Sequence, residues 1–333
     1  MTDLQTAPSS EGSAAKPKRR INLGFDKYSG LYVWALLILI FALWIPDLFL
    51  QVSTLKQVLT FQAISAIVAL GLIIPVAAGA FDLTIAGTLT VSVCFTAWAL
   101  SNHYGVIVAA GGAILIGVVI GLVNSLVVVK LKVDSFIGTL GMSSVLIAIA
   151  YMITNSSQIV LSTEGYAPFF EFAREQIFGL PRSVYYAAAI AAFFWWILEY
   201  TPGGRYLYAI GGNPVASRLA GVRVGRITMI AFIASAVTSA FGGIVYLSTI
   251  GTATPDSGSG YLLPAFSAVF LGATQIRPGR VNVLGTLVAI FLLATGVTGL
   301  QLAGAPGYVT ELFNGAALII AVALASRTAR RRG

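Results

Sequence analysis

Ten apolar segments, separated by short polar stretches, constrain the fold of this chain more than any other feature. With 57% hydrophobic and only 10% charged residues, the chain could not form one soluble core without exposing large apolar surfaces to water. An α-helix of roughly 20 apolar residues crosses a bilayer core about 30 Å thick. The sequence therefore predicts an all-α, multi-pass membrane protein with about ten transmembrane helices. The segments are 31–50, 58–78, 83–100, 105–129, 136–153, 184–198, 227–249, 262–273, 281–300 and 309–325.

The Lys and Arg residues predict the orientation of these helices. With ten spans, 17 of the 20 basic residues fall on one side of the membrane, which leaves only Lys56, Arg174 and Arg182 on the other. Cytoplasmic loops retain positive charge, so both termini are predicted to be cytoplasmic. Segment 262–273 is too short to span comfortably and is expected to be tilted, broken or partly interfacial. Removing it from the count would put the Arg-rich tail outside, against the rule.

The polar stretches define the predicted domain organisation. Residues 1–28 form a basic, disordered cytoplasmic N-terminus, because their composition cannot bury apolar surface. A signal peptide is the alternative, but the following apolar run is long and lacks a small-x-small cleavage site, which favours an uncleaved first helix. Residues 29–326 form the transmembrane domain, with a cytoplasmic loop at 201–226 and an extracytoplasmic loop at 155–182. Residues 327–333 form a basic cytoplasmic tail.

Several classes of chemistry have little support in the sequence. Cys94 and His103 are the only residues of their types, so neither a disulfide nor a Cys- or His-based metal site is expected. No Walker A loop is present to bind nucleotide phosphates. The basic residues flank membrane segments without interleaved aromatics, which the positive-inside rule explains without nucleic acid. We therefore expect no enzymatic activity, no cofactor and no nucleic-acid partner.

The loop between the sixth and seventh segments carries the sharpest local signal. Asn213 suits a helix N-cap, Pro214 suits the first helical position, and Gly221 suits a left-handed C-terminal cap. Within this short helix Val215 and Leu219 are four residues apart and share a face. The pattern is typical of a docking element. An interfacial helix lying on anionic lipid remains the alternative, because basic residues and a small apolar face would also serve that role.

Four blocks of the chain resemble the permease subunits of ribose-type bacterial ABC importers. They read AIGGNPVASRLAGVRV, ALGLIIPVAAGAFDLTIAG, GLVNSLVVVKLKVDSFIGTLGM and AFSAVFLGATQIRPGRVNVLGTL. The blocks occur in the family's order and together cover most of the chain, which makes the resemblance specific although each piece alone is Gly- and Ala-rich.

The resemblance implies a function and a set of partners. The chain would be the transmembrane permease subunit, without an ATPase site of its own, of an ATP-driven importer in the bacterial inner membrane. It would carry a monosaccharide or related small polar solute. Its partners would be a second permease subunit (a homodimer), two cytoplasmic ABC ATPase domains and an extracytoplasmic sugar-binding protein. The ATPase-coupling residues would be Gly212, Asn213, Pro214, Val215, Ala216, Ser217, Arg218, Leu219, Ala220 and Gly221.

The chain departs from the family pattern at several positions. Arg277 and Pro278 replace a Gly-Gly pair, and Leu262, Leu263 and Pro264 replace an acidic pair. The segment before Asp82 lacks paired glycines, and FSAVFLGA has one Gly where two are usual. These differences preserve the expected architecture but leave the substrate open, because the pathway need not be tuned for ribose.

Polar or aromatic residues in the matched blocks are candidates for lining the pathway: Gln62, Asp82, Asn124, Phe136 and Thr139. Each has a structural alternative. Asp82 can cap the helix that begins near residue 83, an interpretation we favour, and polar residues in spans also serve helix packing. The outer loop 155–182, with an interfacial helix, and the turn 252–260 are the expected platform for the binding protein.

Two other function classes remain open at the level of sequence. An ion-coupled secondary carrier for a small polar solute should show paired intramembrane charges, whereas Asp82 stands nearly alone. A membrane scaffold or channel would not need the capped basic helix. The permease hypothesis leads.

Overall fold

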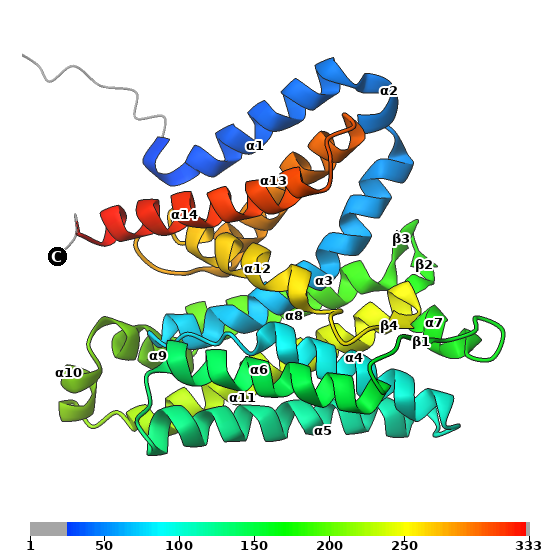
Figure 1. The fold of residues 1–333 in the computed structure, drawn as a ribbon. Helices are drawn as coiled ribbons and strands as arrows, with labels where there is room; N and C mark the ends of the chain where they lie inside the picture. The colour runs from blue at the N-terminus through cyan, green and yellow to red at the C-terminus, as the bar shows by residue number, and fades with distance from the viewer. Residues whose placement is uncertain (1–24, 331–333) are drawn as a thin grey trace, which may run out of the picture.

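The computed structural model describes residues 25–330 of the chain, and most of them are helical. The predicted N-terminal segment 1–28 therefore lies mostly outside the described residues, as do the last three residues of the predicted tail. Figure 1 shows the helices stacked roughly side by side, with few strands. The helices are α1 Phe25–Trp44, α2 Pro46–Phe49, α3 Val52–Ala77, α4 Ile85–Ser101, α5 Val106–Ser125, the π-helical η1 Leu126–Lys130, α6 Ser135–Thr154, α7 Ala167–Arg174, α8 Arg182–Tyr200, α9 Pro202–Gly212, α10 Pro214–Leu219, α11 Val224–Ile250, α12 Ser259–Gly272, α13 Val283–Leu302 and α14 Tyr308–Arg330.

Seven helices in residues 25–330 are long and apolar enough to cross a membrane. They are Val52–Ala77, Val106–Lys130, Ser135–Thr154, Arg182–Tyr200, Val224–Ile250, Val283–Leu302 and Tyr308–Ala325. Three shorter apolar helices, Tyr28–Trp44, Ile85–Ser101 and Ser259–Gly272, complete the set. The chain is thus a mostly helical, multi-pass membrane protein. Each shorter helix corresponds to one of the ten predicted segments.

Helices α3, α4 and α11 form the buried centre of the bundle. Helix α11 packs against α3, α4 and α5, while α12 packs against α13, α14 and α3. The spans contain small residues that let the backbones approach closely. At Gly121 of α5, for example, an added Cβ would lie 2.5 Å from Ile233 Cα of α11. The Gly117–Gly121 pair therefore packs α5 onto α11.

The two ends of the bundle differ in character. Figure 1 shows α9, α10, the start of α1 and the end of α14 at one end, and α7 with the strands at the other. Strands β1 (Ile159–Val160) and β4 (Thr252–Ala253) pair antiparallel, and β2 (Gln176–Ile177) forms a hairpin with β3 (Leu180–Pro181). We call these the α10 end and the α7 end. The interfacial helix expected in loop 155–182 corresponds to α7.

Helix α12 follows a turn that is buried against α4, whereas its first two residues, Ser259 and Gly260, are exposed. After α11, Gly251 turns the chain with a φ of +86°, β4 pairs with β1, and a short segment runs inward to α12. Gly258 is buried, and its N–H donates to Thr90 Oγ1 on α4 at 2.9 Å. An added Cβ at Gly258 would lie 2.1 Å from Ala86 O, so only glycine fits there. The predicted outer turn 252–260 is therefore partly buried, and it leads into a half-helix.

The boundaries of three predicted spans need correction. Segment 31–50 is broken at Ile45, because Pro46 starts a separate short helix, α2. Segment 58–78 begins earlier, at Val52, since its polar first turns are helical as well. The short eighth segment, predicted at 262–273, is α12 and starts three residues earlier.

Candidate functional site

The short capped helix predicted from residue 213 is present as α10. Asn213 Oδ1 accepts hydrogen bonds from the N–H groups of Val215 and Ala216 at 3.0 and 2.9 Å. Pro214 occupies the first helical position, and Gly221 follows the helix with a φ of +83°. Glycine adopts this left-handed backbone conformation without strain, whereas a residue with a Cβ would be strained in it. The predicted caps are therefore confirmed.

Helix α10 presents its side chains to the exterior of the chain. Val215 and Leu219 are 63% and 86% exposed, and only Ser217 of this helix is buried. No ion pair within residues 25–330 uses Arg218. An exposed apolar pair beside an unpaired cation suits contact with another protein or with a lipid surface.

A second helix, α9, precedes α10 and was not predicted. Thr201 caps it by accepting from Gly204 N–H at 3.4 Å, and Pro202 stands at its first position. The Thr-Pro pair was the sequence signal for this helix. Near its other end, an added Cβ at Gly211 would lie 2.3 Å from Ala77 O. Helix α9 thus joins α10 directly to the end of α3.

An ionic cluster ties this region to the turn between α12 and α13. Glu199, at the end of α8, pairs with Arg277 and with Arg280, the latter at 2.9 Å. The Arg280 guanidinium lies 4.5 Å from the ring centre of Tyr208 on α9. Tyr208 Oη donates to Val281 O at 2.9 Å. Burial raises the pKa of the Tyr208 hydroxyl, which nearby Arg280 partly opposes, so this donor keeps its proton at neutral pH.

Three of the predicted pathway residues meet around the start of α4. Asp82 Oδ1 accepts from the Thr84 N–H and hydroxyl, and Asn124 Nδ2 donates to Thr84 Oγ1 at 2.8 Å. Thr139 Oγ1 accepts from Leu83 N–H at 3.0 Å. The prediction that Asp82 caps this helix is wrong, because α4 begins at Ile85, Thr84 is at its N-cap position and no side chain caps it. The Asp82 bonds instead hold the turn that precedes α4. All three predicted residues are buried within the chain.

The other two predicted pathway residues lie elsewhere. The Phe136 ring packs edge-on against Phe81 with 6.3 Å between ring centres, and half of its surface is exposed. Gln62, on α3, lines a cavity of about 170 Å³ between α3, α12, α13 and α14. The structure therefore does not gather the five residues into one site.

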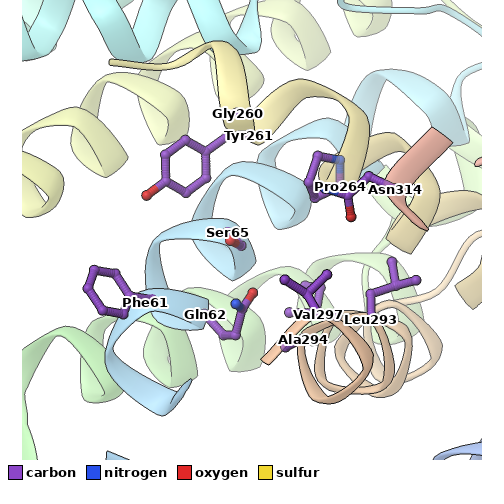
Figure 2. A pocket seen from close by; sticks show the side chains of 11 residues that line it. Phe61, Gln62, Ser65, Gly260, Tyr261, Pro264, Leu293, Ala294, Val297 and Asn314 are labelled. Atoms are coloured by element: carbon purple, nitrogen blue, oxygen red, sulfur yellow. The ribbon is translucent and has the colours of Figure 1, made fainter. Parts of the chain in front are cut away.

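The cavity beside Gln62 carries further polar groups that the sequence did not single out. Figure 2 shows Gln62 and Ser65 of α3, Tyr261 of α12 and Asn314 of α14 around one space. None of these four side chains uses its polar atoms in a hydrogen bond to the described part of the chain. Only the tertiary packing brings them together, because they come from three helices far apart in sequence. Across residues 25–330, no group of three or more His, Cys, Asp or Glu could hold a metal ion.

Comparison with known proteins identifies the family of this chain. The family model described as "Branched-chain amino acid transport system / permease component" matches residues 54–322, which is most of the chain. The chain belongs to this permease family. No solved structure matches it significantly.

Characterised relatives extend the match to nearly the full length. The ribose import permease protein RbsC of Escherichia coli (strain K12) is 30% identical over 275 residues, covering 82% of this chain and 86% of RbsC. The L-arabinose transport system permease protein AraH of the same organism is 31% identical over 316 residues, covering 94% and 95%. The D-allose transport system permease protein AlsC is 25% identical, covering 96% and 97%.

These findings confirm the resemblance predicted from the sequence. The chain is a permease subunit of the ribose-type ABC importer family, and ATP hydrolysis belongs to a partner subunit. With seven candidate spans in its described residues, it is a multi-pass protein of the bacterial inner membrane. Family membership also implies an ATPase and a substrate-binding protein as partners in general terms.

Proposed function

We propose that this permease translocates a monosaccharide or a closely related small polar solute, delivered by an extracytoplasmic sugar-binding protein and driven by two cytoplasmic ABC ATPases. Similarity to permeases named for ribose, L-arabinose and D-allose supports the substrate class. A single observation carries the coupling mechanism: α10 is a capped, outward-facing helix with two exposed apolar side chains at the α10 end.

Ten transmembrane helices with both termini in the cytoplasm are part of this proposal. The seven long spans and the three shorter apolar helices together supply ten membrane segments. The start of α1, the end of α14 and helix α10 lie at the same end of the bundle (Figure 1). Most Lys and Arg residues belong to loops and termini that the positive-inside rule assigns to the cytoplasm. Loop 201–226 then faces the ATPases and loop 155–182 faces the binding protein.

The ATPase-coupling surface extends in this proposal from Gly212 to Gly221. ATPase closure would push α10, and α9 would pass this displacement to α3, whose end it contacts. The ion pairs of Glu199 would carry the same displacement to the turn before α13. Rigid elements joined in this way move as bodies rather than deforming continuously. A second copy of the chain would complete the pathway as a homodimer.

The candidate pathway residues take two roles. We propose that Gln62 contacts the passing solute, since it lines a cavity. Asp82, Asn124 and Thr139 would hold α4, α5 and α6 together beside the pathway, because their hydrogen bonds connect these helices.

Assembly of the importer tests the coupling assignment. Arg218→Glu reverses the charge on α10, and Gly221→Val strains the turn after it; we expect each to weaken ATPase retention and transport. The measurement is co-purification of the ATPase with the permease, followed by ATP-driven uptake in proteoliposomes. Normal retention and normal uptake in both variants would show that α10 is not the docking element.

The ion-coupled carrier is distinguished by its energy source. Uptake by the permease alone, driven by an ion gradient in proteoliposomes without any ATPase, would support the carrier and contradict the importer. We expect no uptake above background under that condition.

A further inference from the structure

We infer that the cavity between α3, α12, α13 and α14 is a transient binding site for a neutral monosaccharide during its passage through the membrane. This inference rests on the proposed function and assigns it a place in the chain. The cavity holds about 170 Å³ and is lined by Gln62, Ser65, Tyr261 and Asn314 together with apolar side chains. Figure 2 shows these polar groups around the same space.

The polar groups of the cavity match the chemistry of a sugar. Each carboxamide of Gln62 and Asn314 offers both donors and an acceptor, and the hydroxyls of Ser65 and Tyr261 can do either. Sugar hydroxyls also donate and accept. Asn314 is only 8% exposed, yet no hydrogen bond in the described part of the chain uses its side chain. The polar atoms of Gln62, Ser65 and Tyr261, which are half-buried, and of Asn314 are therefore free to bond to a solute in the cavity.

Gln62 belongs to α3, one of the helices long and apolar enough to cross a membrane. Gln62 comes ten residues after the first residue of α3, Val52, which places it about 15 Å along that helix. Unpaired polar groups at such depth are unfavourable in lipid and usually mark a pathway. Helix packing does not account for them, because none bonds across to a neighbouring helix.

The start of α12 adds a backbone donor to the same site. Helix α12 begins at Ser259, and Gly260, an exposed residue in its first turn, lines the cavity. Within residues 25–330 no acceptor receives the Gly260 N–H, whereas the N–H groups of Ser259 and Tyr261 are bonded to Asp256 O and Gly258 O. Half-helices that start at membrane depth direct such free N–H groups at transported solutes.

The lining selects a neutral solute. No charged side chain lines the cavity, so an amino acid or a sugar phosphate would leave its charges unpaired there. Pockets for drug-sized ligands span roughly 300–1,000 Å³, so this smaller space suits a solute of about ten non-hydrogen atoms. Aromatic rings of Phe61 and Tyr261 can cover the apolar face of a sugar ring. A neutral pentose or hexose meets all of these requirements.

Cysteine accessibility in the complete importer tests the site directly. Ser65→Cys is prepared in the full complex, reconstituted with its ATPase and binding protein, and treated with a charged methanethiosulfonate reagent. Leu59→Cys is the matched control, because it lies on the same helix but lines an apolar groove with α1 and α13. The native Cys94 is buried and stays in place. We expect the thiol of Ser65→Cys to react and the thiol of Leu59→Cys to stay unreactive. The reagent attacks the thiolate, and a thiol ionises only where water reaches it.

Protection by sugar shows whether the solute visits the cavity. D-ribose, L-arabinose and D-allose are added separately with ATP, and the sugar that is transported should slow labelling of Ser65→Cys several-fold. Gln62→Leu should lower uptake about tenfold, equal to about 1.4 kcal/mol, while ATP hydrolysis stimulated by the binding protein stays normal. Gln301→Leu is the control, because this exposed amide bonds only to Thr310 and lies outside the cavity.

The outcomes separate the site from the function. If a sugar is transported but labelling of Ser65→Cys is absent or unprotected, or Gln62→Leu transports normally, the cavity is not the transit site and the proposed function stands. If the wild-type importer moves no monosaccharide with ATP and its binding protein, the monosaccharide function itself fails, and the site inference fails with it.

Discussion

Truncating Leu219 should weaken binding of the ATPase without harming the permease. Leu219 is 86% exposed at the end of α10, so its side chain contributes little to the packing of the isolated chain. Fully burying a leucine side chain is worth about 1.5–3 kcal/mol. If a partner covers Leu219, Leu219→Ala removes most of that contribution at each of the two interfaces. A loss of 1.4 kcal/mol is a tenfold change in affinity, so we expect the dissociation constant to rise about tenfold or more.

The assay is titration of the purified ATPase onto the permease in nanodiscs, read by a fluorescent label on the ATPase. Leu131→Ala is the matched control, because Leu131 is also an exposed leucine, follows η1 and lies outside α9 and α10. Surface substitutions of this kind usually change stability by less than about 0.5 kcal/mol, so thermal unfolding should be unchanged in both variants. Equal affinities for the wild type and Leu219→Ala would refute docking through this face. A loss seen only in anionic nanodiscs would instead indicate that α10 rests on lipid.

Three further substitutions test the elements that support the site. Asn213→Ala removes the α10 cap and should destabilise this helix by about 1 kcal/mol, lowering ATPase affinity while Asn213→Asp retains it. Glu199→Gln should lower the thermal midpoint of the permease, because two arginines lose a carboxylate that is only 9% exposed, whereas Glu175→Gln, at 46% exposure, should change it little. Gly121→Ala should destabilise the bundle by about 1–3 kcal/mol, since its Cβ would lie 2.5 Å from the α11 backbone, and Gly111→Ala on the same helix, with nothing within 4 Å, should be tolerated. Equal ATPase affinity of Asn213→Ala and the wild type would contradict the role of the cap. Equal thermal midpoints of Glu199→Gln and Glu175→Gln would contradict the role of the ionic cluster. Equal thermal midpoints of Gly121→Ala and Gly111→Ala would contradict the close packing of α5 on α11.

Local sequence signals predicted α10 well because its determinants lie within nine residues. The Asn213 cap and the left-handed Gly221 need no distant partner, so residue type alone defined the helix. Helix α9 had comparable signals in Thr201 and Pro202, but it lies in the loop between two apolar segments, where only the helix from Pro214 was predicted. The role of Asp82 was harder to predict, because its neighbours Asn124 and Thr139 come from other helices.

The sequence by itself determined the membrane class, the approximate positions of the spans, the capped helix that begins at Pro214 and the family. These follow from hydropathy over some 20 residues and from motifs within single segments, which are local properties of the chain. Only the tertiary structure decided that the turn before α12 is buried against α4 and that Gln62, Ser65, Tyr261 and Asn314 share one cavity. In lipid, apolar surface carries little information about which helix packs on which, so close contacts of small residues and interhelical hydrogen bonds make that choice.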